Sequence, residues 1–155
     1  MESDPELTID EQVAHMRDAY PGFSLITTEP WIALWRGQLT PFAREYDVQV
    51  LYSAVSLDLA AIKAKRVHVE IHRPLLRPRA DACIPHIYPN NSAPPFPRLC
   101  LHQLHEWAPS MIIADTIMPW TLEWLVAYEG WRATGTWFAG GHNTEREKLA
   151  VRRRS

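Results

Sequence analysis

The chain contains few cysteines and glycines, and it has no long apolar run. Its 155 residues include 2 cysteines, Cys83 and Cys100, and 6 glycines. Because no stretch reaches about 18 consecutive apolar residues, the sequence predicts no membrane-spanning segment and no membrane partner. The formal net charge of -2 lacks the basic excess of a non-specific nucleic-acid binder, so no nucleic-acid partner is expected.

Several familiar chemical motifs are absent as well. The sequence has no glycine-rich phosphate loop, no G-x-S-x-G turn, no H-E-x-x-H pair and no C-x-x-C pair. We therefore expect no cofactor and no catalytic metal. Residues 1–10 are acidic and polar and lack the basic start and apolar stretch of a signal peptide. This pattern predicts a cytoplasmic protein, in which both cysteines are thiols because paired cysteines are rare in that compartment.

The length predicts one domain over residues 1–155, with a polar tail from about residue 143. Hydrophobic residues make up 46% of the chain, which is enough for a folded core. A chain of about 150 residues buries roughly 68–70% of its unfolded surface, so it needs no disulfide or metal to fold.

Proline is the residue in excess, with 13 in the chain. Seven of them lie between Arg73 and Cys100, and at this density we expect neither a strand ladder nor a helix. Loops longer than about 12–15 residues are usually functional when they are ordered. Apolar residues within this segment favour an ordered loop.

The remaining pattern indicates an α+β fold. Thr8 and Glu11 form a capping-box pattern that predicts an amino-terminal helix. Alternating or β-branched runs predict strands over residues 24–38, 46–52 and 66–72, and short connections make them antiparallel. A main helix is expected after Asp115 as its cap, ending at Gly130 or Gly135, with a further polar, helix-like stretch over residues 144–151.

The residues that could carry chemistry gather around the end of the proline-rich segment. We identify Cys100 as a candidate nucleophile, because a free thiol with a pKa of about 8.5 needs only a modest shift to react near neutral pH. His102 would point the same way as Cys100 if this stretch is extended. Asn90 or Asn91 is a candidate donor to a developing oxyanion.

Two other interpretations compete with a cysteine nucleophile. Cys83 and His86, together with Cys100 and either His105 or His102, would provide four ligands of the types that zinc takes. The alternative is structural, with a buried cysteine and surface histidines.

The order of these segments resembles the active-site region of ubiquitin-conjugating enzymes. The similar stretches are P-H-I-Y-P-N at residues 85–90, L-C-L at 99–101 and W-A-P-S at 107–110. The resemblance implies a ubiquitin-conjugating-enzyme-like (UBC) fold, with an N-terminal helix, an antiparallel meander sheet, a long proline-rich active-site loop and C-terminal helices.

The chain is similar, more closely, to bacterial relatives of these enzymes in cyclic-oligonucleotide-based anti-phage signalling systems (CBASS). The further shared stretches are T-I-x-P-W at residues 116–120, W-L-x-x-Y-E at 124–129 and T-G-x-W-x-x-G-G-H at 134–142. This resemblance implies antiviral defence and, as partner, a cGAS-like nucleotidyltransferase or another protein substrate, conjugated through its own carboxyl terminus.

The implied reaction is a thioester relay on Cys100, which would receive a protein acyl group and pass it to an amine. The sequence departs from the family pattern, because His86 precedes Ile87 and Tyr88, and Asn90 is farther from the cysteine. His102 replaces the usual aspartate, so activation would depend on His102 or His86, both of which titrate near neutral pH. Two alternatives remain, an inactive UBC-fold scaffold and a zinc-stabilised interaction domain.

Overall fold

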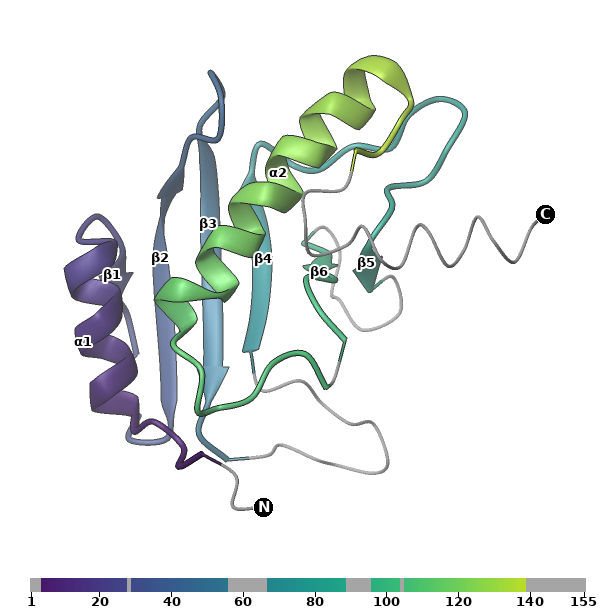
Figure 1. Ribbon diagram of the computed structural model, residues 1–155. Coiled ribbons are helices and arrows are strands. Elements are labelled where there is room, and N and C mark those ends of the chain that lie inside the picture. Colours follow the sequence, from purple (N-terminus) through teal and green to yellow (C-terminus); the bar gives the residue numbers. More distant parts are fainter. Residues whose placement is uncertain (1–3, 28, 56–66, 89–95, 104, 139–155) are drawn as a thin grey trace.

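The computed structural model describes residues 4–27, 29–55, 67–88, 96–103 and 105–138. These residues form an α+β fold, as the sequence predicts (Figure 1). The helices are α1 (Ile9–Ala19), the short 3-10 helix η1 (Ile113–Asp115) and α2 (Ile117–Thr134). The strands are β1 (Ser24–Leu25), β2 (Ile32–Leu39), β3 (Tyr46–Ser53), β4 (Val67–Arg73), β5 (Ile87–Tyr88) and β6 (Arg98–Leu99).

The described strands form one antiparallel sheet in the order β1-β2-β3-β4-β6-β5. The expected strand over residues 24–38 is divided into β1 and β2, with Pro30 between them, because proline cannot donate to a central ladder. Strand β6 lies beside β4, and β5 forms the edge. Cys100, which follows β6, is therefore near one edge of the sheet, and α1 lies at the opposite edge, beside β1 (Figure 1).

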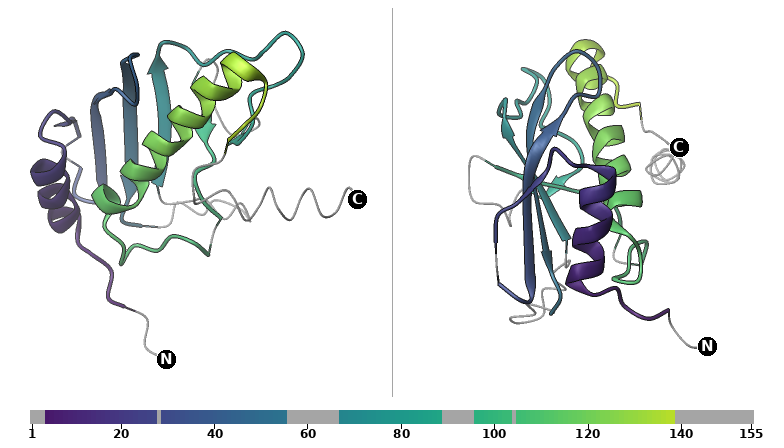
Figure 2. Two further views of the ribbon diagram at one scale, coloured as in Figure 1. Left: turned by 45° about the horizontal axis from the view of Figure 1, so that its top comes forward. Right: turned by 90° about the vertical axis from the view of Figure 1, so that its left-hand side faces the viewer.

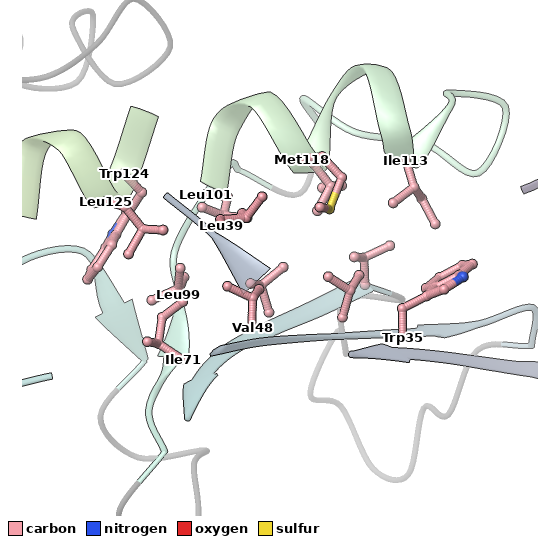
Figure 3. Close-up of a cluster of buried hydrophobic side chains, with 14 of the residues drawn as sticks. Trp35, Leu39, Val48, Ile71, Leu99, Leu101, Ile113, Met118, Trp124 and Leu125 are labelled. Carbon is pink, nitrogen blue, oxygen red and sulfur yellow. The ribbon is translucent and has the colours of Figure 1, made fainter. Parts of the chain in front are cut away.

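One face of the sheet is covered by α2, which crosses it diagonally (Figure 2). The side chains of β3 and β4 alternate, so that Val48, Val50, Val69 and Ile71 are buried while their neighbours are more exposed. Figure 3 shows these strands facing Trp124, Leu125 and Met118 of α2 across the core. Of the four aromatic residues of α2 that helical spacing assigns to the core, Trp124, Tyr128 and Trp131 are buried, and Trp120 is half-buried.

Helix α1 begins with the predicted capping box. The Glu11 backbone N–H donates to the Thr8 hydroxyl, and the Thr8 backbone N–H donates to the Glu11 carboxylate. The fully buried amide of Gln12 then joins α1 to the segment before α2. It donates to the Met111 carbonyl at 2.9 Å and accepts from the Ile113 N–H at 3.0 Å.

The predicted cap of the main helix is wrong. Asp115 ends η1, and Thr116 is the residue before α2. Pro119 stands at the third position of α2 and has no backbone N–H, so a capping side chain has one donor fewer to satisfy. The Thr116 hydroxyl instead donates to the Ile112 carbonyl and accepts from the Trp107 indole. Gly135, in the left-handed region at φ 80°, is the carboxyl-terminal cap.

The proline-rich segment contains more regular structure than its composition indicates. We expected no ladder between Arg73 and Cys100, but β5 and β6 pair within it, with Ile87 opposite Leu99. Each strand is only two residues long and contains no proline, so the prolines before and after it cost no ladder hydrogen bond.

Other expectations fall outside the described residues, namely the polar tail from about residue 143 and the helix-like stretch over 144–151. In the part of the chain that the structure does describe, neither α1 nor α2 has the length and apolar character needed to cross a bilayer.

Candidate functional site

Cys100 follows β6 directly, and its backbone is fixed on both sides. Leu99 and Leu101 are buried and point into the core, where Figure 3 shows them near Trp124 and Leu125. The Cys100 backbone N–H donates to the carbonyl oxygen of His86 at 2.8 Å, which continues the β5–β6 pairing by one residue. Cys100 as a whole residue is half-buried. Its backbone is anchored, as the sequence predicts.

Tyr88 contacts the sulfur of Cys100. The Cys100 Sγ and the Tyr88 hydroxyl oxygen are 3.3 Å apart, with the thiol as donor. Tyr88 lies on β5 opposite Arg98 of β6, two residues before the cysteine. Diagonal neighbours on one face of an antiparallel pair lie within reach of an aromatic side chain. The pairing of the two short strands therefore brings the phenol to the thiol.

His86 acts on the site through its backbone. Its φ of 52° is in the left-handed region, which non-glycine residues rarely occupy. In this conformation its carbonyl oxygen accepts two hydrogen bonds, from the Cys100 N–H at 2.8 Å and from the Trp124 indole at 3.0 Å. The His86 ring lies beside Trp137, with ring centroids 5.1 Å apart. Backbone strain of this kind gathers at functional sites.

His102 is buried rather than displayed on an extended strand. The chain bends at this residue, so the condition for His102 to point the same way as Cys100 is not met. Its ring lies near Trp107 and Trp120, with centroid distances of 6.2 Å and 5.8 Å. Nδ1 lies 2.6 Å from the Gln103 carbonyl oxygen. Since a carbonyl only accepts, Nδ1 carries the proton in this contact, and Nε2 is the remaining nitrogen for proton transfer.

Strand β6 is also attached to the sheet through its polar face. Glu70 of β4 pairs with Arg98, and its carboxylate lies 4.0 Å from the Arg98 Nε. The same carboxylate contacts the ring of His72 at 3.0 Å and accepts from the Gln49 amide at 3.3 Å. The His72 ring stacks on Phe96, with centroids 4.1 Å apart. These contacts fix the approach of the chain to Cys100.

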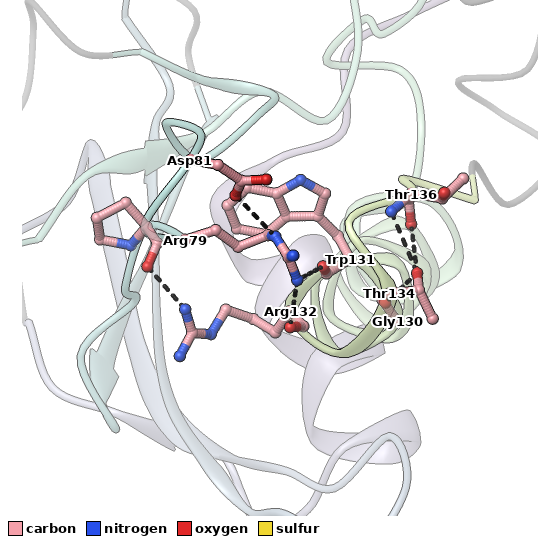
Figure 4. A network of polar contacts seen from close by, with 8 residues as sticks. Arg79, Asp81, Gly130, Trp131, Arg132, Thr134 and Thr136 are labelled. Atoms are coloured by element: carbon pink, nitrogen blue, oxygen red, sulfur yellow. Dashed lines mark hydrogen bonds and ion pairs between the residues drawn. The ribbon is translucent and has the colours of Figure 1, made fainter.

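The chain before His86 is held to the end of α2 by two arginines (Figure 4). Arg79 donates to the Arg132 carbonyl at 2.8 Å and to the Trp131 carbonyl at 3.3 Å. In the other direction, Arg132 donates to the Pro78 carbonyl at 2.7 Å. A guanidinium at a helix carboxyl terminus satisfies the last carbonyls and complements the helix dipole. Helix α2 therefore anchors both the start of this segment and, through Trp124, the His86 carbonyl.

The remaining predicted residues are not assembled with Cys100 by any contact described above. Asn90 lies outside the described residues, so its role as an oxyanion donor stays a prediction. Cys83 and His105 are exposed. Across the described ranges, no three histidine, cysteine, aspartate or glutamate side chains lie close enough to hold a metal ion. The four-ligand zinc set of the sequence alternative is therefore not brought together.

Two residues of the site were not identified from the sequence. Tyr88 contacts Cys100 across 12 positions of sequence, and Trp124 contacts His86 across 38. Helical spacing indicated Trp124 only as a core residue. The one available signal for Tyr88 was its place in the stretch Pro85-His86-Ile87-Tyr88 that resembles the conjugating enzymes.

Comparison with known proteins assigns the chain to a family. No curated protein matches the chain. A family model described as Type II CBASS E2 protein matches residues 12–145, most of the chain, and this range includes Tyr88, Cys100 and His102. We therefore conclude that the chain belongs to the family of Type II CBASS E2 proteins.

Proposed function

We propose that this protein is a cysteine-dependent acyltransferase of the ubiquitin-conjugating type that acts in CBASS anti-phage defence. In this proposal it has the UBC fold and carries a protein carboxyl-terminal acyl group as a thioester on Cys100. Membership of the Type II CBASS E2 family supports the biological setting. The antiparallel sheet covered by α2, after an amino-terminal helix, agrees with the fold that the family resemblance implies.

The observation that carries the proposal is the environment of Cys100. The residue is half-buried and not enclosed, while its backbone is held by a hydrogen bond to His86 and by the buried neighbours Leu99 and Leu101. A nucleophile in such a site approaches its substrate with little loss of conformational freedom, which is a main source of rate enhancement in acyl transfer.

The reaction requires two transfers. The Cys100 thiolate attacks the carbonyl carbon of an activated acyl donor, an S–C bond forms, and the bond from that carbon to the donor's leaving group breaks. An amine then attacks the thioester carbon, an N–C bond forms, the amine loses a proton, and the S–C bond breaks to return the thiolate. His102 and His86 remain the proposed proton carriers, and Asn90 the proposed oxyanion donor.

The proposed protein substrate is a cGAS-like nucleotidyltransferase, joined through its own carboxyl terminus to an acceptor amine. This assignment derives from the CBASS family and not from a surface of this chain. The proposal places the reaction in the reducing cytoplasm, where a thiol at Cys100 stays available.

The test is formation of an adduct that dithiothreitol reverses. We would incubate the protein with a cGAS-like nucleotidyltransferase of a Type II CBASS system and with an acyl-activating enzyme, then separate the products without reducing agent. Wild-type protein and the Cys83→Ala variant should both form the adduct, while Cys100→Ala should form none. Cys83 is a matched control, because it is exposed and is the other cysteine of the chain.

A different result would reject the proposal. An adduct that persists in Cys100→Ala but disappears in Cys83→Ala would assign the chemistry to the other thiol. No adduct in any variant, with donor shown to be activated, would favour the inactive scaffold.

A further inference from the structure

The Cys100–Tyr88 contact has a chemical meaning beyond packing. In the thiol form, S–H donates to the phenol oxygen over 3.3 Å. Once the sulfur loses its proton it no longer donates, and the phenol O–H rotates to donate to the sulfur instead. A phenol, with a pKa near 10, keeps its proton beside a thiolate, whose parent thiol has a pKa near 8.5. Hydrogen bonds to charged acceptors are about twice as strong as neutral ones.

We propose that Tyr88 is a catalytic residue of this site, whose hydroxyl donates to the Cys100 sulfur whenever that sulfur carries negative charge. The inference rests on the proposed function, because it names a further group for the same thioester chemistry. It assigns this role to Tyr88 because Tyr88 has a described contact with the reacting atom itself.

The position of Tyr88 suits this role. Its backbone lies in β5, which is paired with β6, and β6 is in turn paired with β4 through Glu70 and Arg98. The phenol is therefore held by the sheet, and the cysteine by the His86 carbonyl. A donor and an acceptor fixed on paired strands need little reorganisation when charge develops between them.

The hydroxyl acts twice in the cycle. Before the first transfer it stabilises the attacking thiolate, with the thiol proton passing to a base or to solvent. In the second transfer the S–C bond breaks, the electron pair returns to sulfur, and the phenol again donates to the departing thiolate. In both steps the O–H bond of Tyr88 stays intact, so the tyrosine is a donor and not a proton carrier.

Alkylation of Cys100 by iodoacetamide tests the inference without any protein substrate. We would use a Cys83→Ala background, so that Cys100 is the only thiol, and compare Tyr88→Phe with the parent from about pH 7 to about pH 10. Loss of the donor lowers the thiolate fraction near pH 7 by about tenfold, and increased intrinsic nucleophilicity offsets about half of this on a logarithmic scale. We therefore expect Tyr88→Phe to react about threefold more slowly near pH 7.

The pH profile separates this role from a structural one. Near pH 10 a thiol is largely ionised in both proteins, and the phenol of the parent begins to lose the proton that it donates, so Tyr88→Phe should react as fast as the parent or faster. A change in exposure or packing would move both rates in the same direction. Tyr20→Phe is the matched control, because Tyr20 is the carboxyl-terminal cap of α1. Helix α1 lies at the edge of the sheet opposite to β5 (Figure 1), so this substitution should leave the pH profile unchanged.

Equal profiles for Tyr88→Phe and the parent would overturn the inference, as would a rate that falls at both extremes of pH. If Tyr88→Phe does not fold, as judged by circular dichroism, Tyr88→Gln and Tyr88→Met form a second pair of similar length. Only the glutamine retains a donor, so it should react faster near pH 7. A crossover in alkylation together with no dithiothreitol-sensitive adduct would reject the proposed function while leaving the thiolate contact established.

Discussion

The backbone N–H of Cys100 donates a 2.8 Å hydrogen bond to the carbonyl oxygen of His86, a residue in the left-handed region of backbone space. The same oxygen accepts from the indole of Trp124 on α2. One carbonyl therefore links the candidate nucleophile to the main helix, and the backbone conformation of His86 sets the direction of that link.

The left-handed backbone conformation of His86 predicts that glycine is more stable than alanine at this position, the reverse of the usual order. His86→Gly and His86→Ala both remove the ring, but a left-handed residue other than glycine costs roughly 1–2 kcal/mol. We expect His86→Gly to be more stable than His86→Ala by about 1 kcal/mol, measured as the free energy of unfolding in urea. His105, exposed and without positive φ, is the control, and there alanine should be the more stable. Equal values for the two His86 variants would contradict the prediction.

Gly37 in β2 is predicted to tolerate no side chain. A Cβ at this position would lie 2.5 Å from ring atoms of Phe23, which is itself buried. We expect Gly37→Ala to lower the free energy of unfolding by about 1–3 kcal/mol, because overpacking forces neighbouring groups to shift. Gly22→Ala is the matched control, since nothing lies within 4 Å of its Cβ, and it should change stability little. A Gly37→Ala protein as stable as Gly22→Ala would show that Phe23 moves freely.

Gln12 is predicted to be the polar link between α1 and the start of α2. Gln12→Leu has similar volume but leaves the Ile113 N–H and the Met111 carbonyl without their side-chain partner. Since a buried, unsatisfied group costs about 1–3 kcal/mol and the Ile113 N–H is buried while Met111 is half-buried, we expect a loss of about 1–3 kcal/mol by chemical denaturation. The control His15→Leu changes an exposed position on the same helix and should have an effect within about 0.5 kcal/mol. Similar losses in both variants would refute this role for Gln12.

The raised pKa of Tyr46 predicts that the stability of the fold decreases at alkaline pH. Burial, and then its 2.8 Å hydrogen bond to the Glu129 carboxylate, raise the pKa of Tyr46 above its ordinary value near 10. The folded state therefore keeps a proton that the unfolded state loses, so this contribution is complete below about pH 10 and decreases as pH rises above it.

The comparison of wild type with Tyr46→Phe measures this contribution. Between about pH 9 and pH 11, the free energy of unfolding measured in urea should fall more steeply for wild type than for Tyr46→Phe. The extra loss in wild type should reach about 1 kcal/mol at the upper end of this range. Parallel curves would mean that Tyr46 ionises equally in the folded and unfolded states.

Local residue patterns predicted most of the described fold. Three features could be predicted from the sequence because they depend on neighbours within a few residues. They are the capping box of Thr8 and Glu11, the alternation in β3 and β4, and Gly135 as one of two expected helix ends. The wrong cap at Asp115 shows the limit of this approach. The Thr116 hydroxyl bonds to Trp107 and Ile112, and those contacts exist only after the chain has packed.

The candidate site likewise has features that local sequence predicts and features that depend on the folded chain. Residue type and local spacing were enough to predict an α+β chain with a thiol at Cys100 between two apolar residues that would anchor it. The packed structure was needed to show that Tyr88 contacts the sulfur, that the His86 carbonyl holds the Cys100 backbone, and that His102 is buried near Trp107 and Trp120. These contacts join distant residues or depend on a bend, and they form when strand pairing and core burial compensate the entropy of ordering the residues of β5 and β6.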